Sequence, residues 1–220
     1  MPSRSRDPHA GGSAEGGSAA GDVAAAMRAM TDGAAERSRR AARELGDAAE
    51  AAGLLDVAYA TVQTPIGELL VAMSRRGLMR VAFEEEIADT VAELAGAVSP
   101  RVLRSRRATD DVRRQLEEYF DGRRHAFDVP VDLSSVRGFT RRVLRETARI
   151  PFGSVLTYRE VAGRAGNSRA MRAAGNALHA NPVPVVVPCH RVIRTGGGLG
   201  GYGGRLDRKE ALLRLEGALL

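Results

Sequence analysis

The sequence has one cysteine and one lysine among its 220 residues. A single cysteine cannot form an intramolecular disulfide bond, and it excludes a zinc site built from several thiolates. No apolar run approaches the roughly 20 residues that a membrane-spanning helix requires. The amino terminus lacks the apolar core of a secretory signal. These absences predict a protein of the reducing cytoplasm, without disulfides and without membrane association.

Acidic residues become scarce toward the carboxyl terminus. The net charge is −1 over residues 1–53 and −3 over residues 54–136, whereas residues 137–220 hold 15 basic and 5 acidic side chains and carry +10. Nearly every basic residue is arginine. Compositional bias explains why arginine is used instead of lysine, but it does not explain why the positive charge is concentrated after residue 136. A basic segment of this kind is typical of proteins that bind a polyanion such as nucleic acid.

Composition and periodicity divide the chain into three parts. Residues 1–53 are rich in glycine, serine and alanine, and we expect a disordered or weakly helical extension. Residues 54–131 predict a small α/β domain, because strand-like runs separated by Pro/Gly turns precede two amphipathic helices. Residues 132–220 predict a mainly helical domain. The strands are expected at 56–63, 68–74 and 78–85, and the helices of the small domain at 88–98 and 110–122.

Two short helices joined by a glycine-containing turn lie in the last domain. Thr157 can cap the helix YREVAGRA, and Ser168 can cap the alanine-rich helix RAMRAAGNALHA. This arrangement is a candidate helix-turn-helix. The small residues of the second helix leave its backbone open, and Arg172 projects from it, which suits close contact with DNA. Packing between helices would also use alanines, so that alternative stays open.

Prolines surround the only cysteine. The segment NPVPVVVPCHRVI contains three prolines, which exclude an ordinary helix or a central strand. Its valines indicate burial, and we expect a stiff extended segment that ends at Cys189. His190 and Arg191 follow, and cationic neighbours lower the pKa of a thiol, which predicts a thiolate nucleophile. A buried structural cysteine is the more common alternative.

PCHRV preceded by NPVP resembles the active-site motif of the methylated-DNA–protein-cysteine methyltransferases, the O6-alkylguanine-DNA alkyltransferases. The similarity extends over IPFGSVLTYREVA, the turn AGN, the helix RAMRAAGNALHA and the tail GGGLGGYGGRLDRKEALLRLEG, nearly without a break from residue 132 to 217. Residues 54–84 are similar more loosely. The resemblance implies an α/β fold, with a small ribonuclease H-like domain of antiparallel sheet and helix followed by a winged-helix-like domain with a helix-turn-helix.

By this resemblance the protein is a DNA-repair transferase that reacts once. It would act as a monomer on double-stranded DNA from the minor groove and rotate an O6-alkylguanine nucleotide into a pocket. A methyl or larger alkyl group would then pass irreversibly to Cys189, and repair of O4-alkylthymine stays open. The alkyl donor is the DNA itself, so no cofactor is implied.

The resemblance also assigns roles to individual residues. Cys189 would be the nucleophile, His190 would accept its proton through a water, and Glu216 would orient His190. Tyr158 would donate a proton to the leaving guanine, and Asn181 would tie the helix-turn-helix to the active-site segment. The implied DNA-binding residues are Arg172, which would fill the vacated stack, with Tyr158, Arg159, Asn167 and Ala173; the implied substrate pocket is Pro184, Val192, Gly200, Tyr202, Gly203 and Gly204.

Three positions depart from the family pattern. Some relatives carry serine where Gly203 stands, so only a backbone amide would bind O6, and the open loop would admit larger alkyl groups. Relatives often have arginine where His179 stands, which weakens an expected phosphate contact. The zinc ligands that some relatives carry near the amino terminus are absent, so we expect no metal.

Three other functions compete with alkyl transfer. A lesion-binding protein without transfer activity would share the helix-turn-helix and the pocket but lack the cysteine. A thiol hydrolase using Cys189, His190 and Glu216 would need an oxyanion hole, and it leaves the basic segment unexplained. A transcription regulator would read the major groove with side chains richer in hydrogen-bonding groups than this alanine-dominated helix offers.

Overall fold

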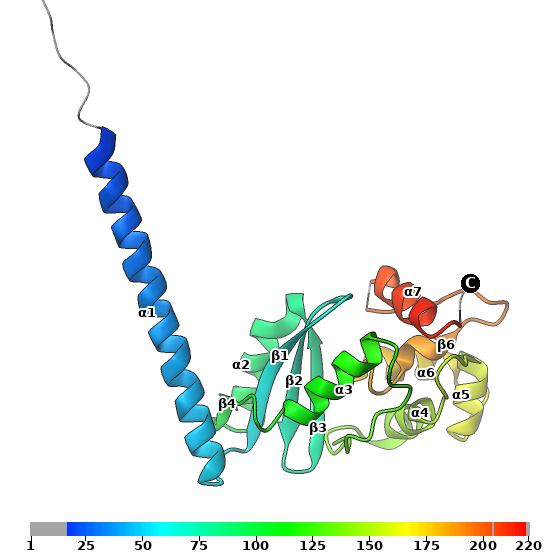
Figure 1. Ribbon diagram of the computed structural model, residues 1–220. Helices are drawn as coiled ribbons and strands as arrows, with labels where there is room; N and C mark the ends of the chain where they lie inside the picture. Colours follow the sequence, from blue (N-terminus) through cyan, green and yellow to red (C-terminus); the bar gives the residue numbers. More distant parts are fainter. Residues whose placement is uncertain (1–16, 204, 219–220) are drawn as a thin grey trace, which may run out of the picture. The chain divides into compact units, whose positions relative to one another are not determined.

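The computed structural model describes residues 17–203 and 205–218, and its first element is one long helix (Figure 1). This helix, α1, spans Gly17–Ala51 and so takes up most of the extension expected at residues 1–53. Residues 1–16 of the expected extension lie outside the described residues. The first compact unit of the chain ends at Glu44, and the second begins at Leu45. Within the described ranges, no helix is both long and apolar enough to cross a membrane.

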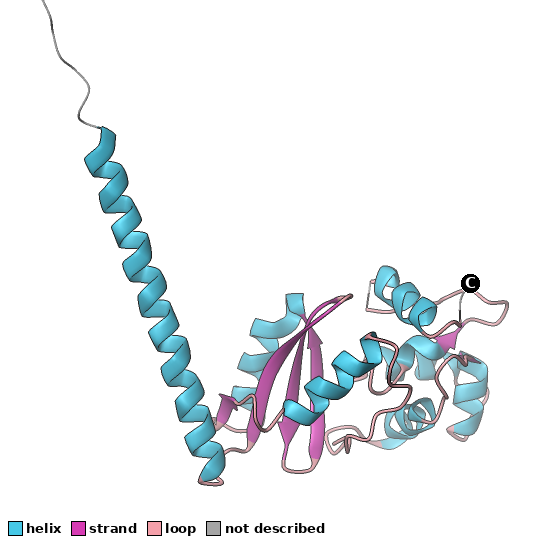
Figure 2. Cartoon of the chain, viewed as in Figure 1, coloured by secondary structure: helices cyan, strands magenta, loops and turns pink. Residues whose placement is uncertain are grey.

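A four-stranded sheet with the order β3-β2-β1-β4 opens the second unit (Figure 2). Its first three strands form the antiparallel meander that the turns predict, with Val57 opposite Ser74 at one end of the first hairpin and Thr64 opposite Gly67 at the other. The sequence pattern does not predict β4, because three residues are too few to show alternation. The bounds are Val57–Thr64 for β1, Gly67–Ser74 for β2, Gly77–Phe83 for β3 and Val102–Arg104 for β4.

Two helices cover opposite faces of this sheet. Helix α2 contributes Leu94 to one apolar cluster with Leu70, and helix α3 contributes Leu116 to another with Leu69. Successive side chains of a strand point to opposite faces, so the uninterrupted run LLVA at 69–72 is buried on both sides. The bounds are Glu84–Glu86 for the 3-10 helix η1, Ile87–Ala97 for α2 and Asp110–Phe120 for α3.

The elements after residue 132 are mainly helical, which confirms the fold class. Thr157 caps α5 as predicted, and Glu160 completes a capping box. The prediction for Ser168 is wrong: the next helix starts at Met171, because a turn closed by Ala170 N–H donating to Asn167 O comes first. The bounds are Gly138–Ala148 for α4, Leu156–Thr157 for β5, Tyr158–Arg164 for α5, Met171–His179 for α6, Cys189–Arg191 for the 3-10 helix η2, Val192–Ile193 for β6 and Leu206–Leu215 for α7.

The outer edge of β3 joins the sheet to the helical part. Leu78 donates its N–H to Pro130 O and accepts from Asp132 N–H, at 2.8 and 2.9 Å, and Val81 N–H donates to Pro182 O at 2.8 Å. These bonds satisfy backbone groups that a free edge strand would expose. The boundary predicted between residues 131 and 132 therefore does not separate two compact units, since the second unit continues through it.

Substitution of Gly77 by alanine tests this junction. Gly77 has a φ of +133°, and an added Cβ would lie 2.1 Å from Pro130 O. We expect Gly77→Ala to lower the free energy of unfolding by about 2 kcal/mol or more, from backbone strain and the clash together. Denaturant unfolding followed by circular dichroism measures the loss. The control is Gly96→Ala in α2, where no atom lies within 4 Å of the added Cβ and alanine favours the helix. Equal stability of both variants would contradict the prediction.

Candidate active site

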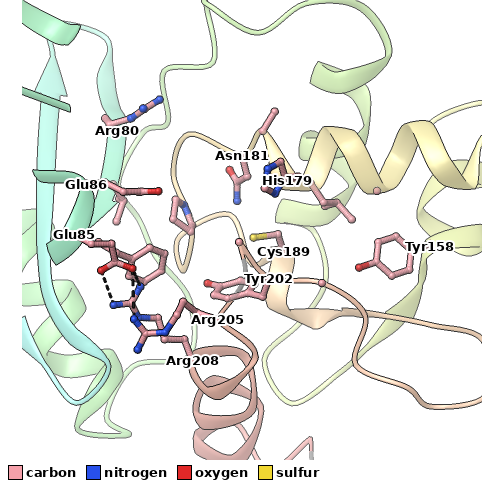
Figure 3. A pocket seen from close by; sticks show the side chains of 18 residues that line it. Arg80, Glu85, Glu86, Tyr158, His179, Asn181, Cys189, Tyr202, Arg205 and Arg208 are labelled. Carbon is pink, nitrogen blue, oxygen red and sulfur yellow. Dashed lines mark hydrogen bonds and ion pairs between the residues drawn. The ribbon is translucent and has the colours of Figure 1, made fainter. Parts of the chain in front are cut away.

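A cavity of about 700 Å³ lies beside Cys189, within the second unit (Figure 3). Its walls come from β3 and η1 on one side and from α6, the cysteine segment and the glycine loop on the other. This volume is in the range of pockets that hold small organic ligands. Seven residues that the sequence analysis singles out line it: Tyr158, His179, Asn181, Pro184, Cys189, Tyr202 and Gly203.

The segment that leads to Cys189 is not the stiff extended segment expected from its prolines. It folds into turns, in which Val187 N–H donates to Val183 O at 2.9 Å and Val185 has a φ of +72°. The side chain of Asn181 holds these turns by donating from Nδ2 to Val187 O and accepting from Val183 N–H, at 2.8 and 3.1 Å. Proline excludes a helix or a central strand, but it is compatible with turns. The contacts of Asn181 fit the tying role that the resemblance implies.

The prediction of a thiolate at Cys189 is also wrong for the resting protein. The residue is 8% exposed, and this burial raises the pKa of its thiol, although a hydrogen bond with Asn181 and the charge of Lys209 act in the opposite direction. Arg191 does not supply the expected charge at the sulfur, because its guanidinium binds Glu216 instead. The effect of desolvation on the thiol pKa is thus larger than the combined effects of Asn181 and Lys209.

The carboxylate of Glu216 is the centre of a buried hydrogen-bond network. His190 Nε2 lies 2.8 Å from Oε1, the Tyr119 hydroxyl donates to the same oxygen at 2.6 Å, and Gly153 N–H donates to Oε2 at 3.2 Å. Arg191 donates to both oxygens, from Nη2 at 2.9 Å and from Nε at 2.8 Å. Burial by itself would raise the pKa of Glu216, but the hydrogen bonds from His190 and Arg191 more than offset it and lower the pKa to about 2.

His190, the residue after Cys189, is fully buried. Burial lowers the pKa of its imidazole, against the opposing effect of Glu216, so the ring is neutral at pH 7. A neutral ring that donates from Nε2 to the carboxylate has a lone pair on Nδ1. Among the described residues, Nδ1 has no hydrogen-bond partner. The imidazole can therefore accept a proton at Nδ1 while Glu216 stabilises the resulting cation.

Tyr158 stands across the cavity from the sheet, with its hydroxyl turned toward Cys189 (Figure 3). Burial raises the pKa of this phenol, so it retains its proton and can act as a donor. Gly200 does not line the cavity but lies against the ring: an added Cβ would be 2.6 Å from the Tyr158 hydroxyl. Glycine at that position therefore allows the loop to approach Tyr158 closely.

Other residues implied by the resemblance lie away from the cavity. Val192 is fully buried and does not line it; its carbonyl accepts a hydrogen bond from Lys209. Gly204 lies outside the described residues. By contrast, His179, where relatives often have arginine, is exposed and lines the cavity wall. The DNA-binding set other than half-buried Tyr158 is exposed on α5, α6 and the turn between them: Arg159, Asn167, Arg172 and Ala173.

The amino-terminal half contributes to the cavity without any signal in the sequence. Glu85 accepts two hydrogen bonds from Arg208 on α7, at 2.6 and 2.9 Å, and these lower its pKa to about 2. The same guanidinium lies 4.2 Å from the centre of the Phe83 ring. Arg208 is 123 positions from Glu85, so no local pattern relates the two. Tyr119 is likewise unpredicted as a partner of Glu216, from which it is 97 positions distant.

Comparison with known families divides the second unit into two matched regions. Residues 57–133 match the ribonuclease-like domain of 6-O-methylguanine DNA methyltransferase. Residues 138–218 match the DNA binding domain of the same family. Helix α1 precedes both matched ranges.

Individual proteins are similar over the same extent. The methylated-DNA–protein-cysteine methyltransferase of Methanosarcina acetivorans is 38% identical over 165 residues, which are 73% of this chain and 98% of that protein. The protein of that name from Mycolicibacterium paratuberculosis is 39% identical over 160 residues, 73% of this chain and 92% of the relative.

Solved structures show the same likeness. The crystal structure of Mycobacterium tuberculosis O6-methylguanine methyltransferase has 36% identity and a TM-score of 0.60, and it covers 74% of this chain and 93% of its own. The crystal structure of Mycobacterium tuberculosis OGT in complex with DNA has 35% identity and a TM-score of 0.61. The match covers 73% of this chain and 93% of that chain.

Replacement of Glu216 by glutamine tests the buried network. Glu216→Gln leaves the buried guanidinium of Arg191 without its counter-charge, and we expect a loss of about 3 to 5 kcal/mol in the free energy of unfolding at pH 7. The pKa of Glu216 is lowered from its ordinary 4.5 to about 2, so its contribution is complete above pH 4.5 and disappears as the pH falls toward 2.

Unfolding measured between pH 7 and pH 2.5 or so therefore separates the variant from the wild type, because only the wild type loses this contribution in acid. Glu210→Gln is the control, since Glu210 is 46% exposed and its nitrogen–oxygen distance to Arg214 is 3.9 Å. Parallel pH profiles for the wild type and Glu216→Gln would contradict the prediction.

Proposed function

The chain belongs to the methylated-DNA–protein-cysteine methyltransferase family, and we propose that it repairs DNA by transferring an alkyl group from O6 of guanine to Cys189. The observation that carries this proposal is the position of Cys189 in a cavity, with the His190–Glu216 pair buried behind it. The cysteine distinguishes the protein from a lesion binder without transfer activity. The similarity to a structure solved in complex with DNA supports DNA as the partner.

The first step is the activation of the thiol. The proton on Sγ of Cys189 passes through a water to Nδ1 of His190, which is neutral and has a free lone pair. Glu216 stabilises the imidazolium that forms, because its carboxylate stays ionised down to a pH of about 2. The thiolate forms when this proton moves, since burial favours the neutral thiol in the resting protein.

The second step is the transfer itself. Sγ of Cys189 attacks the alkyl carbon, and the S–C bond forms as the bond between that carbon and O6 breaks. The electron pair of the broken bond remains on the guanine, which takes a proton from Tyr158 and leaves as a neutral base. Tyr158 then regains a proton from water, and His190 releases to water the proton that it took from the thiol, so both side chains end neutral. The thioether product is stable, so each molecule reacts once and needs no cofactor. Among the described residues, none other than its chain neighbours lies within 4 Å of a Cβ added at Gly203, and this open space supports acceptance of alkyl groups larger than methyl.

Binding to duplex DNA uses the helix-turn-helix of α5 and α6. The target base lies inside the stack, so its nucleotide rotates into the cavity from the minor groove. Arg172 fills the space that the base leaves, and the exposed residues Arg159, Asn167 and Ala173 contact the backbone nearby. The net charge of +10 over residues 137–220 favours this partner. We further propose that the protein acts as a monomer in the cytoplasm, where the thiol stays reduced.

Mass spectrometry of the cysteine peptide tests the transfer. After incubation with an excess of an oligonucleotide that contains O6-methylguanine, we expect each wild-type molecule to gain one methyl group on Cys189. Cys189→Ser removes the nucleophile and should gain none. Repeated turnover of the oligonucleotide without an adduct on the protein would rule out the proposed function.

Arg172→Ala tests the role of the arginine in base rotation. Unstacking a base costs a few kcal/mol, so we expect transfer from duplex DNA to slow by about tenfold or more. Transfer from free O6-benzylguanine needs no rotation and should keep its rate. Arg123→Ala is the control, because Arg123 is exposed and paired with Asp121 in the amino-terminal half. Equal slowing with the duplex and with the free base would remove this role from Arg172.

A further inference from the structure

The only lysine of the chain is buried in α7, which packs against the 3-10 helix that carries Cys189, and no step above uses it. Lys209 is fully buried in α7, and its Nζ donates a hydrogen bond to Val192 O at 2.6 Å. An ammonium group has three donors, and this carbonyl satisfies one of them. Burial of a cation is costly unless an opposite charge compensates for it. The other 32 of the 33 basic residues are arginines, so a lysine at this position departs from the chain's own preference.

The charged and titratable groups that face Lys209 belong to the active site. Cys189 and His190 come from η2, which packs against α7, and Arg194 follows β6. Cys189 is the member of this set that can become an anion. Burial lowers the pKa of Lys209 to about 8, a negative charge on Cys189 raises it and the cation of Arg194 lowers it. Lys209 in turn lowers the pKa of the Cys189 thiol.

We propose that the ammonium of Lys209 stabilises the negative charge on Sγ of Cys189 between the loss of the thiol proton and the attack on the alkyl carbon. This inference rests on the proposed function. Lys209 touches neither the alkyl group nor the base, so it is a positioning residue that acts through the sulfur. It keeps its own proton throughout: the thiol proton still goes to His190, and the guanine still takes its proton from Tyr158.

The hydrogen bond to Val192 O explains how the ammonium is held. Val192 follows Cys189 by three positions, at the end of η2, so this bond fixes the cation to the segment that carries the nucleophile. A compact ammonium can meet one carbonyl in a closed space, whereas the planar guanidinium of arginine is wider and needs partners for five donors. Once Cys189 becomes a neutral thioether, the ammonium has no anion to stabilise.

Reaction of the single cysteine with iodoacetamide measures this effect without DNA. The rate as a function of pH reports the apparent pKa of Cys189 alone, because the chain has no other cysteine. Lys209→Met removes the charge at similar length, and we expect it to raise this pKa by about one unit. Lys209→Arg keeps a charge but has the wider guanidinium, so it should restore the lower value only in part. Arg214→Met is the control, because Arg214 is on the same helix but 65% exposed.

Methyl transfer from the oligonucleotide is the second measurement. At pH 7 we expect Lys209→Met to transfer about tenfold more slowly than the wild type, in proportion to the change in the thiol pKa. The wild-type rate should rise with pH as the thiolate fraction rises, and it should rise less steeply above about 8, where Lys209 loses its proton. Lys209→Met has no such proton and should show no change of slope there. If Lys209 had only a structural role, the slope of the wild-type transfer rate against pH would not change near 8.

The outcomes separate the two proposals. If Lys209→Met leaves both the iodoacetamide profile and the transfer rate unchanged, Lys209 has no such role. If Lys209→Met does not fold, the wild type still decides, because a transfer rate whose rise with pH does not become less steep above pH 8 or so overturns the inference. If the wild type forms no adduct on Cys189, the proposed function fails, and the iodoacetamide profiles still test whether Lys209 acts on the sulfur.

Discussion

The buried carboxylate of Glu216 is the interaction on which the geometry of the active site depends. It receives hydrogen bonds from α3 through Tyr119, from the loop before β5 through Gly153, and from η2 through His190 and Arg191. A buried anion is tolerated only when such partners surround it, so each of these segments must be in place. The same contacts orient the imidazole behind the sulfur. Stability and catalytic geometry therefore rest on one side chain near the carboxyl terminus.

Desolvation acts on the reacting groups in opposite directions. It raises the pKa of the Cys189 thiol, lowers the pKa of the His190 imidazole and lowers that of Lys209. The resting pair is thus a neutral thiol and a neutral imidazole, and a nucleophile appears only after a proton has moved. The protein can react only once, and a neutral thiol reacts more slowly than a thiolate with alkylating agents other than the substrate. Charge stabilisation by Lys209 would then compensate for the cost of forming the anion in a dry site.

The amino-terminal half has a supporting part in this chemistry. Its sequence contains no recognisable catalytic motif, yet β3 donates a hydrogen bond from Val81 to Pro182, at the start of the cysteine segment. Glu85 binds Arg208 on α7, the helix that carries Lys209 and is followed directly by Glu216. The cavity is closed on one side by this half, so the size and shape of the space beside the sulfur depend on both parts of the second unit.

The sequence by itself determined what depends on neighbouring residues. Alternating apolar residues and turns predict the β1–β2–β3 meander, Thr157 predicts the cap of α5, and the PCHRV motif identifies Cys189 and its family. Only the tertiary structure decided the folding of the proline segment into turns, the direction of the Cys189 pKa shift and the partners of Glu216. The physical reason is the separation along the sequence over which each effect acts. Propensity and capping act over a few residues, whereas desolvation and the pairing of Tyr119 with Glu216 arise only when distant segments pack together.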